Sequence, residues 1–556
     1  MISGKRLLLD LLHQEGIEYI FGNPGTTELP LIDALAVDNR IKYILGLQEA
    51  TVMGMADGFA QGSGSLSFAS LHAAPGLGNA IGALHNAAKA GAPVIVTAGQ
   101  QDLSFNITEP NLWGNLTRIA EPFVKWSYEV QRIADLPRVI HRAAKIALTP
   151  PTGPVFISLP ADLLSENTDA DAGQPTRVGA AIRADRATIA LAARILAAAK
   201  SPVIVAGDAV ATSGAIDELV AFAELIGAPV FLEGIPNRTP FPPQHGLFRG
   251  PLVRLPEQIR QAMGAHDVIA SIGGDLFTLA MPGDGDPMPA GKKIVHLDDN
   301  PWELGKNYPT EAAIFGDPKV TLPELVEATR AVMNGEVRQA AQQRCTEAMA
   351  QGHAQLGKLK AQARDVSGRI PVHPFALSLA IAETIPKDTV IVDEGITSGQ
   401  GLRRFLENAD SRSYFGGRGG GIGWGMPAAV GIKLSMPDRP MVALIGDGSA
   451  MYSVQALYSA AREKLQIVFV IANNGSYRII KQRTHGVLGH AAQTGKYVGV
   501  DLNDPPLDHV SIARGFGVEG IKVGSVVEFR VALAKGLATS GPCLIEVDVE
   551  TGYKPL

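Results

Sequence analysis

Short apolar runs alternate along the whole chain with glycine-rich turns and with longer stretches of helical pattern. Examples are APVIVTAG, PVFISLP, SPVIVAG, DVIASIGG, TVIVDEG, MVALIGDG and QIVFVIAN. A strand with one face in water would alternate apolar and polar residues, but almost every position in these runs is apolar. The pattern therefore predicts strands that are buried on both faces, in parallel sheets covered by helices.

Two polar stretches interrupt this rhythm and divide the chain into thirds. One covers residues 165–185 and is rich in Asp, Thr, Gly and Pro; the other runs from about 342 to 369 and is predicted to be partly helical. Each outer third opens with a helical segment and closes with a Gly-Pro strand, TGPVFISLP or SGPCLIEVD, which is a hint of two related domains flanking a different one. We predict three consecutive doubly wound α/β domains with parallel sheets, over residues 1–165, 186–341 and 370–556.

Composition and charge narrow the class of protein. The 556 residues are 46% hydrophobic and 19% charged, which is typical of a globular enzyme, and the length predicts several domains. A net charge of -6 without a basic cluster argues against a nucleic-acid surface. No apolar run approaches the ~20 residues of a membrane span.

The cysteines and the first residues of the chain indicate the cellular compartment that is expected for the protein. Cys345 and Cys543 lie far apart, without metal-binding spacing or a disulfide framework, so a reducing cytoplasm is expected. Asp10 interrupts the apolar run of the opening MISGKRLLLDLL, which is therefore interpreted as an amphipathic helix rather than a signal peptide.

The strongest local signal lies in MVALIGDGSAMYSVQALYSAAREKLQIVFVIANNGSY. A strand, a helix and a second strand are predicted over 441–446, about 453–463 and 466–472. Asp447, Asn474 and the Ser476 carbonyl would then offer hard oxygen ligands at the carboxyl ends of two strands, which suits Mg²⁺ or Ca²⁺ with a phosphate partner. From spacing alone, two turns with Asp447 as a helix cap explain the segment about equally well.

The run from Gly446 to Asn474 resembles the metal-diphosphate motif of thiamine-diphosphate-dependent enzymes. The resemblance covers the whole chain, and FGNPGTTELPLIDAL, LQEATVMGMADGFAQ and LHAAPGLGNAIGAL are most similar to the benzoylformate decarboxylases of the acetolactate-synthase-like superfamily. It implies pyrimidine-binding, middle and diphosphate-binding domains in that order, with thiamine diphosphate and Mg²⁺ as cofactors. The implied contacts on the diphosphate side are Gly446, Asp447, Gly448, Ser449, Asn474, Ser476 and Tyr477.

Glu49 follows the run KYILGL and begins a predicted helix with apolar surroundings. The helix dipole would explain an acid in the first turn, although a buried carboxyl also needs a partner. The resemblance implies that Glu49 hydrogen-bonds the cofactor's pyrimidine ring and so promotes ionisation of its thiazolium ring. The resemblance also places Ile422 under the bent cofactor and the Gly420 carbonyl at its exocyclic amine. Close packing of a loop onto a helix would by itself explain most glycines of the surrounding run GGRGGGIGWGMPAAVG.

His72 follows the run LSFASL beside a glycine-rich turn. Most histidines in such positions are structural, but the resemblance matches His72 to an active-site histidine and implies proton transfer. Thr26 matches a residue that contacts the substrate carboxylate; a turn or cap hydroxyl is an equal alternative, and Thr27 could cap instead. A second histidine of the benzoylformate decarboxylases has no counterpart, because Leu279 and Ala280 stand near its position.

We predict non-oxidative decarboxylation of a 2-keto acid, of aromatic, benzoylformate-like type, to an aldehyde and carbon dioxide. The missing second histidine keeps open a carboligase or lyase of the acetolactate-synthase or acyl-CoA-cleaving type, unless His485 replaces it. A catalytically silent cofactor-binding protein is the alternative from another class, and Glu49, Asp447 and Asn474 argue against it. A dinucleotide-binding dehydrogenase would need G-x-G-x-x-G after the first strand, which is missing.

The resemblance also bears on further ligands and on assembly. The run KKIVHLDDNPWELGKN resembles relatives in which this region lies near an adenine nucleotide, but a strand and turn without FAD or another nucleotide is favoured here. Family members bind the cofactor between two subunits. A homodimer or homotetramer is therefore implied, with a small 2-keto acid or aldehyde as substrate.

Overall fold

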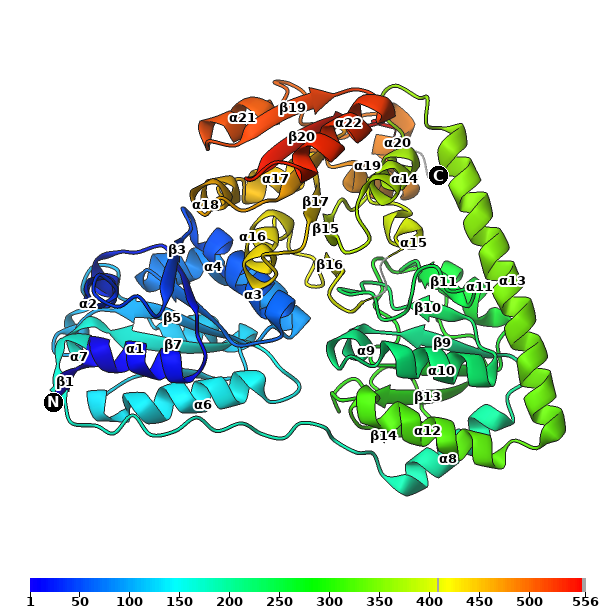
Figure 1. The fold of residues 1–556 in the computed structure, drawn as a ribbon, viewed down its shortest axis with the longest axis horizontal. Helices are drawn as coiled ribbons and strands as arrows, with labels where there is room; N and C mark the ends of the chain where they lie inside the picture. Colours follow the sequence, from blue (N-terminus) through cyan, green and yellow to red (C-terminus); the bar gives the residue numbers. More distant parts are fainter. Residues whose placement is uncertain (408–409, 553–556) are drawn as a thin grey trace.

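The computed structural model describes residues 1–407 and 410–552. It contains three α/β domains: an N-terminal domain drawn in blue to cyan, a middle domain in green and a C-terminal domain in yellow to red (Figure 1). Each domain is built on a six-stranded sheet in which all neighbouring strands are parallel. The predicted fold class is confirmed.

The N-terminal sheet has the strand order β3-β2-β4-β5-β7-β6. Its strands are β2 (Tyr19–Gly22), β3 (Lys42–Leu45), β4 (Ser67–Leu71), β5 (Val94–Gln100), β6 (Ser127–Glu129) and β7 (Val155–Pro160). Its helices are α1 (Gly4–Gln14), α2 (Leu29–Leu35), α3 (Glu49–Ser63), α4 (Ala73–Ala90), α5 (Leu116–Ala120), α6 (Leu136–Leu148) and α7 (Ala161–Ser165). Every residue of β4, β5 and β7 is buried, as the unbroken apolar runs predict. A short antiparallel pair, β1 (Ile2–Ser3) with β8 (Asn167–Thr168), closes the domain.

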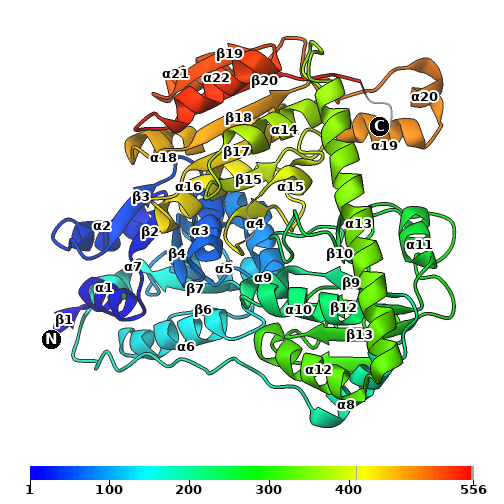
Figure 2. The same ribbon diagram turned by 45° about the vertical axis from the view of Figure 1, so that its right-hand side comes forward.

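The middle sheet has the order β11-β10-β9-β12-β13-β14. Its strands are β9 (Pro202–Ala206), β10 (Val230–Leu232), β11 (Phe248–Pro251), β12 (Val268–Ile272), β13 (Lys293–Asp298) and β14 (Ala312–Phe315). Its helices are α8 (Arg186–Ala197), α9 (Asp208–Thr212), α10 (Ile216–Ile226), α11 (Pro256–Gly264) and α12 (Pro318–Val332). A long helix, α13 (Gly335–Asp365), then runs along the side of the middle domain up to the C-terminal domain (Figure 2).

The C-terminal sheet has the order β16-β15-β17-β18-β20-β19. Its strands are β15 (Val390–Glu394), β16 (Tyr414–Gly416), β17 (Met441–Gly446), β18 (Val468–Asn473), β19 (Glu519–Val523) and β20 (Cys543–Asp548). Its helices are α14 (Pro374–Thr384), α15 (Leu402–Phe405), α16 (Gly425–Ser435), α17 (Asp447–Tyr452), α18 (Ala456–Arg462), α19 (Arg478–Gly486), α20 (His490–Thr494), α21 (His509–Gly515) and α22 (Val526–Leu537). None of the helices in the described ranges is long and apolar enough to cross a membrane.

Strand order separates the outer domains from the middle one. Numbered in chain order within each sheet, the strands run 2-1-3-4-6-5 in both outer sheets and 3-2-1-4-5-6 in the middle sheet. The faint similarity of the outer thirds thus corresponds to a shared topology. In each sheet the direction of winding reverses near the middle of the sheet: between β2 and β4, between β9 and β12, and between β15 and β17. Ligands of doubly wound sheets bind at the carboxyl ends of the strands beside such a reversal.

Two sequence-based expectations about helices can be compared with the structure. The helix predicted over about 453–463 corresponds to α18, and a short helix that was not predicted, α17, precedes it and begins directly after β17 at Asp447. The break falls at Ser453, whose hydroxyl donates to the Gly423 carbonyl at 2.7 Å instead of facing solvent. The polar stretch at about 342–369 is partly helical, as expected: up to Asp365 it belongs to the 31-residue helix α13, which is capped by the Asn334 side chain. The strands of the three six-stranded sheets lie within the predicted domain ranges, whose boundaries stay a prediction.

Helices α3 and α16 join the N-terminal and C-terminal domains. One hydrophobic core extends across both domains and includes residues of both helices. Glycines allow close contact of the two backbones: a Cβ at Gly58 would lie 2.3 Å from the Ala428 carbonyl oxygen, and one at Gly431 would lie 1.9 Å from that of Met55. The loops that precede both helices are therefore held in a fixed relation to each other.

Candidate active site

The turns after β17 and β18 meet at the carboxyl edge of the C-terminal sheet, since the two strands are neighbours. The Oδ2 atom of Asp447 accepts the backbone N–H groups of Asn474 and Ser476, each at 3.2 Å. The side-chain oxygen of Asn474 accepts the N–H and the hydroxyl of Ser476, at 3.2 and 3.0 Å. The structure thus brings together the three residues predicted to hold a metal.

These three residues form a buried, oxygen-rich group. Each is at most 5% exposed. Burial raises the pKa of Asp447 although backbone N–H groups lower it, so the carboxylate lacks a full counter-charge. One carboxylate, one amide oxygen and the Ser476 carbonyl are hard donors of the kind that Mg²⁺ or Ca²⁺ binds, and the group therefore fits such a cation. Residues 1–407 and 410–552 hold no cluster of three or more His, Cys, Asp or Glu that could bind a metal.

The remaining predicted diphosphate contacts surround the start of α17. Asp447 Oδ1 accepts the Gly448 N–H at 2.9 Å. A Cβ at Gly448 would lie 2.4 Å from the Tyr477 ring, so only glycine fits between this ring and the turn. Ser449 is buried at the first turn of the helix, beside Gly446. Backbone N–H groups at such a turn suit an anionic phosphate.

A buried pair that the sequence reasoning missed lies beneath this turn. The Nε2 atom of His509 is 3.3 Å from the Asp447 carbonyl oxygen, and its Nδ1 is 3.6 Å from the Glu546 carboxylate. Burial raises the pKa of Glu546, but the neighbouring His509 ring and a hydrogen bond from the Asn473 amide outweigh burial and bring this pKa down to about 2. Glu546 is thus an anion beside His509, whose ring lies against the backbone of the turn at Asp447.

The glycine-rich segment, residues 416–425, connects β16 with α16. The Glu394 carboxylate accepts the N–H groups of Gly423, Trp424 and Gly425, at 2.7, 3.1 and 2.8 Å. Burial raises the pKa of Glu394 to about 7. This acid was not among the predicted site residues, although TVIVDEG ends in an acid and a glycine, as MVALIGDG does.

Asn86 of α4 holds the same segment from the N-terminal domain. Its side chain donates to the Gly421 carbonyl at 2.8 Å and accepts the Gly421 N–H at 2.9 Å. Gly420 is exposed with a φ of +76°, a conformation that favours glycine, and Ile422 is half-buried. Gly420 and Ile422 thus lie on either side of a backbone unit that Asn86 fixes.

Glu49 is the first residue of α3, as predicted, and it is buried. Its two carboxylate oxygens accept the side-chain N–H groups of Asn23 and Asn79, at 3.2 and 3.1 Å. A Cβ at Gly76 would lie 3.2 Å from one of these oxygens, so a glycine leaves room for the carboxylate beside α4. The expectation that a buried Glu49 needs partners is confirmed, and both partners are neutral amides. The sequence offered little signal for them beyond two asparagines in apolar surroundings.

His72 lies directly after β4 and precedes α4. Its Nδ1 is 2.9 Å from the Glu28 carboxylate and 3.1 Å from the Thr27 hydroxyl. Glu28 is itself fixed, because it also accepts the N–H groups of Gly25 and Gly99, at 2.9 and 3.0 Å. A carboxylate at Nδ1 makes Nε2 the nitrogen that can exchange a proton with a ligand. Glu28 was missed by the sequence reasoning, although it stands three residues after Gly25 in the run GTTE.

Other predicted residues are placed less centrally. Thr26 is exposed, whereas Thr27 is buried and donates to Glu28 at 2.7 Å instead of capping a helix. Leu279, which is 41% exposed, and its neighbour Ala280 stand where a second histidine would be needed, so these two positions provide no imidazole. His485 lies on α19 with its Nδ1 3.0 Å from the Tyr497 hydroxyl. The structure therefore pairs His485 with a tyrosine of the loop that follows α20.

Comparison with known proteins identifies the family. Three models of thiamine pyrophosphate enzymes match the chain: the N-terminal TPP binding domain over residues 2–109, the central domain over 189–325 and the C-terminal TPP binding domain over 395–547. A benzoylformate decarboxylase from Pseudomonas aeruginosa is 35% identical over 546 residues, 98% of each chain. The chain belongs to the thiamine-diphosphate-dependent enzymes. The expected resemblance is confirmed.

Further relatives within this family carry the names of two kinds of enzyme, acetolactate synthase and benzoylformate decarboxylase. Acetolactate synthase from Arthrospira platensis is 26% identical over 572 residues, 99% of this chain and 94% of the relative. The thiamine diphosphate-dependent 4-hydroxybenzoylformate decarboxylase from Rhodococcus jostii RHA1 has a similar structure, with a TM-score of 0.86, 31% identity and coverage of 99% and 100%. Benzoylformate decarboxylase from Polynucleobacter necessarius gives a TM-score of 0.87, 30% identity and full coverage of both chains.

Proposed function

We propose that this thiamine-diphosphate-dependent enzyme decarboxylates an aromatic 2-keto acid of the benzoylformate type, releasing an aldehyde and carbon dioxide. The observation that carries the proposal is the pair His72–Glu28, a histidine held at Nδ1 by a fixed carboxylate, in a chain 35% identical to a benzoylformate decarboxylase. Two structural relatives carry the names benzoylformate and 4-hydroxybenzoylformate decarboxylase, which favours an aromatic substrate.

Thiamine diphosphate with Mg²⁺ is the proposed cofactor pair. Bound thiamine diphosphate would supply a thiazolium ring that holds the electrons released when carbon dioxide leaves. Asp447, Asn474 and the Ser476 carbonyl would hold the cation, whose charge offsets both the buried carboxylate and the diphosphate. Gly420 and Ile422 would support the pyrimidine half of the cofactor.

The proton-handling roles fall to two residues of the N-terminal domain. Glu49 would hydrogen-bond the pyrimidine ring, with its carboxylate held in place by Asn23 and Asn79. His72 would deliver a proton from Nε2 to the product carbon, since Glu28 occupies Nδ1. Thr26, exposed beside this cluster, would contact the substrate carboxylate.

We also propose that two subunits complete each active site. Large apolar side chains are exposed next to residues of the site: Ile396, two residues after Glu394, is 58% exposed, and Tyr452, at the end of α17, is 55% exposed. Such side chains beside a binding site suit coverage by a second subunit. A homodimer, or a homotetramer made of two such dimers, would provide it.

A carboligase or lyase is the second candidate function. It is favoured by the loop at Leu279 and Ala280, which carries no histidine, and by the 26% identity to an acetolactate synthase. A histidine at that loop would add a second proton donor, and without it a bound substrate fragment could persist long enough to react with an aldehyde.

A product assay separates the two candidates. Purified protein receives thiamine diphosphate and Mg²⁺ with benzoylformate, pyruvate or a branched 2-keto acid, and carbon dioxide, aldehyde and acyloin are quantified. We expect benzaldehyde and carbon dioxide from benzoylformate, in equal amounts and only with cofactor present. Acyloin as the main product would reassign the protein to the carboligases. Turnover of pyruvate in preference to benzoylformate would refute the aromatic substrate.

A further inference from the structure

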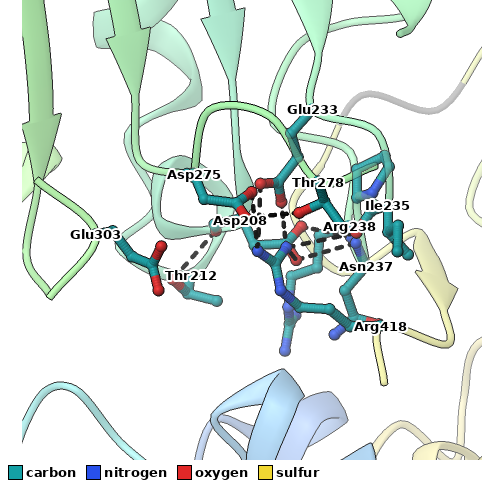
Figure 3. A network of polar contacts seen from close by, with 12 residues as sticks. Asp208, Thr212, Glu233, Ile235, Asn237, Arg238, Asp275, Thr278, Glu303 and Arg418 are labelled. Carbon is teal, nitrogen blue, oxygen red and sulfur yellow. Dashed lines mark hydrogen bonds and ion pairs between the residues drawn. The ribbon is translucent and has the colours of Figure 1, made fainter. Parts of the chain in front are cut away.

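An arginine from the C-terminal domain occupies the carboxyl edge of the middle-domain sheet. Asp208 follows β9 and Asp275 follows β12, the two strands between which the direction of winding reverses. Glu233 follows β10 on the same edge. Figure 3 shows the Arg418 side chain, which belongs to the glycine-rich segment, reaching up between these three carboxylates. This is the part of a doubly wound sheet that ordinarily receives a ligand.

The contacts of Arg418 are numerous and largely buried. Its guanidinium donates to Asp208 at 2.8 Å and to both carboxylate oxygens of Glu233, one of them at 3.2 Å, and it lies 3.9 Å from Asp275. Burial alone would lower the pKa of Arg418, but the surrounding carboxylates raise it well above its usual value, so the cation persists. A bidentate arginine–carboxylate contact of this kind fixes orientation as well as distance.

The edge is also closely packed. A Cβ at Gly207 would lie 2.4 Å from the Gly273 carbonyl oxygen, and a Cβ at Gly274 would lie 2.6 Å from a Glu233 oxygen. The turns that could approach a diphosphate are thus packed against each other and against acidic side chains. An edge lined by carboxylates and filled by a guanidinium does not suit an adenine nucleotide.

A second contact holds the same segment to the middle domain. Asp208 accepts the N–H groups of Asn237 and Arg238, at 3.0 and 2.9 Å, and so fixes the loop after β10. The carbonyl of Asn237 in turn accepts the Gly416 N–H at 2.8 Å. Asp208 therefore supports both Arg418 directly and the beginning of the glycine-rich segment through one intervening residue.

All three domains hold the glycine-rich segment. The middle domain binds it at Gly416 and Arg418, the N-terminal domain at Gly421 through Asn86, and Glu394 of the C-terminal domain at residues 423–425. Asp57 of α3 adds a hydrogen bond from the Trp424 indole at 2.7 Å. Gly420 and Ile422 are the two positions that the proposed function assigns to the cofactor, and both lie between these anchors.

We propose that Arg418 is a positioning residue that ties the cofactor-supporting segment to the middle domain, and that it takes the place of a nucleotide at that domain's ligand edge. The inference rests on the proposed binding of thiamine diphosphate, but not on which 2-keto acid is the substrate. In this protein the middle domain then acts by pre-organising the segment before the cofactor arrives, which lowers the cost of binding.

Arg404 provides a matched control. Like Arg418 it is an arginine of the C-terminal domain that clamps the middle domain, since it donates to the Pro243 and Gly352 carbonyls, the latter at 3.2 Å. It lies on α15, away from the glycine-rich segment. Loss of either arginine should weaken the contact between domains, but only loss of Arg418 should free residues 416–425.

The test compares Arg418→Ala, Arg418→Lys and Arg404→Ala in the full-length protein. Hydrogen exchange of peptides covering 416–425, without cofactor, should rise in Arg418→Ala and stay at the wild-type level in Arg404→Ala. The dissociation constant for thiamine diphosphate with Mg²⁺ should rise about tenfold in Arg418→Ala. It should rise less in Arg418→Lys, which keeps the positive charge but lacks the paired N–H donors of the guanidinium. The KM for the 2-keto acid should change little.

Several outcomes would overturn the proposal. Unchanged exchange and affinity in Arg418→Ala would show that the segment does not depend on this anchor, and Arg418→Lys serves the same comparison if the alanine variant does not fold. Equal loss of affinity in Arg404→Ala would show a general effect of domain contact. Saturable binding of ADP to the wild-type protein by calorimetry would refute the replacement of a nucleotide. Failure to decarboxylate benzoylformate would affect the proposed function alone, because none of these measurements except KM uses a substrate.

Discussion

Two neutral amides hold the Glu49 carboxylate, and this determines what the side chain can do. Asn23 and Asn79 each donate one N–H to it, so its position is defined by two partners that do not neutralise its charge. A paired arginine or lysine would have bound the carboxylate permanently. The arrangement leaves Glu49 able to exchange hydrogen bonds with a ligand that brings a polar ring nitrogen.

Replacement of Glu49 by glutamine tests its role directly. Glu49→Gln keeps the length of the side chain but removes the charge, and we expect turnover to fall by at least about 100-fold with the circular dichroism spectrum and thermal midpoint unchanged. Glu18→Gln, at an exposed position of the same domain, is the control and should leave the rate intact. Near-normal turnover in Glu49→Gln would remove Glu49 from the mechanism.

In the proposed mechanism His72 acts through Nε2, the nitrogen that Glu28 does not hold. His72→Ala should lower kcat by about 100-fold or more while the affinity for thiamine diphosphate stays within a few-fold of wild type. Glu28→Gln should lower kcat by a smaller factor, because the ring remains but its orientation is no longer enforced by a carboxylate. Titration of cofactor into each variant provides the check. A strong loss of cofactor affinity in His72→Ala would instead indicate a structural histidine.

At the scale of elements, the contact between α3 and α16 aligns parts of both outer domains. Glu49 opens α3 and the glycine-rich segment leads into α16, so the helix pair fixes one relative to the other. Asp57, in the middle of α3, accepts hydrogen bonds from Gln61 at 2.8 Å and from the Trp424 indole at 2.7 Å. Burial raises the pKa of Asp57 to about 6, even though both hydrogen bonds lower it.

This raised pKa predicts a pH dependence of stability. Since the folded protein binds the proton of Asp57 more tightly than the unfolded chain does, stability falls as the pH rises from about 4 through about 6. A shift of two pKa units corresponds to about 3 kcal/mol. Asp57→Asn cannot titrate, so the difference in free energy of unfolding between variant and wild type should change by up to about that amount between pH 4 and 7.

Urea denaturation at several pH values measures this difference. Asp169→Asn, at an exposed acid outside the helix pair, should show the same pH dependence as the wild type. If the difference between Asp57→Asn and the wild type is constant across the range, Asp57 is ionised at all of these pH values and the raised pKa is refuted.

At the scale of the whole molecule, the candidate site draws on separate domains of the chain. Glu49 and His72 belong to the N-terminal domain and Asp447 belongs to the C-terminal domain, while Arg418 connects the latter to the middle domain. If the site is completed by a second subunit, Glu49 of one chain acts together with Asp447 of another. A mixture of two inactive variants can reveal such sharing.

Co-expression of Glu49→Gln with Asp447→Asn provides that test. In a mixed dimer one of the two sites would carry both substitutions and the other neither. Random pairing should therefore restore about one quarter of wild-type activity per dimer, although each variant alone is inactive. Absence of any recovery, with mixed dimers demonstrated by differential tags, would place both residues of a site in one chain.

Much of this protein follows from its sequence alone. Unbroken apolar strands followed by glycine turns can only be buried in parallel sheets, so three doubly wound domains were predictable. The metal site could also be predicted from short motifs, because Asp447 and Asn474 follow neighbouring strands whose carboxyl ends lie side by side. Glu49 and His72 were recognised by the same logic of position at a strand end, aided by the resemblance to the family. The helix predicted at 453–463 corresponds to α18, whereas α17 before it was not predicted, because the break between them at Ser453 involves a hydrogen bond to Gly423, thirty positions earlier.

Only the tertiary structure decided which side chains hold these groups in place. Glu28 reaches His72 across 44 positions, Asn86 reaches Gly421 across 335, and Arg418 reaches Glu233 across 185. No local pattern encodes such pairs, since each partner is an ordinary polar residue in its own segment. Their meaning arises when burial removes water and makes every charge and N–H group depend on a defined neighbour. The residues proposed to react were thus accessible from sequence, whereas the residues that hold them in place were decided by packing.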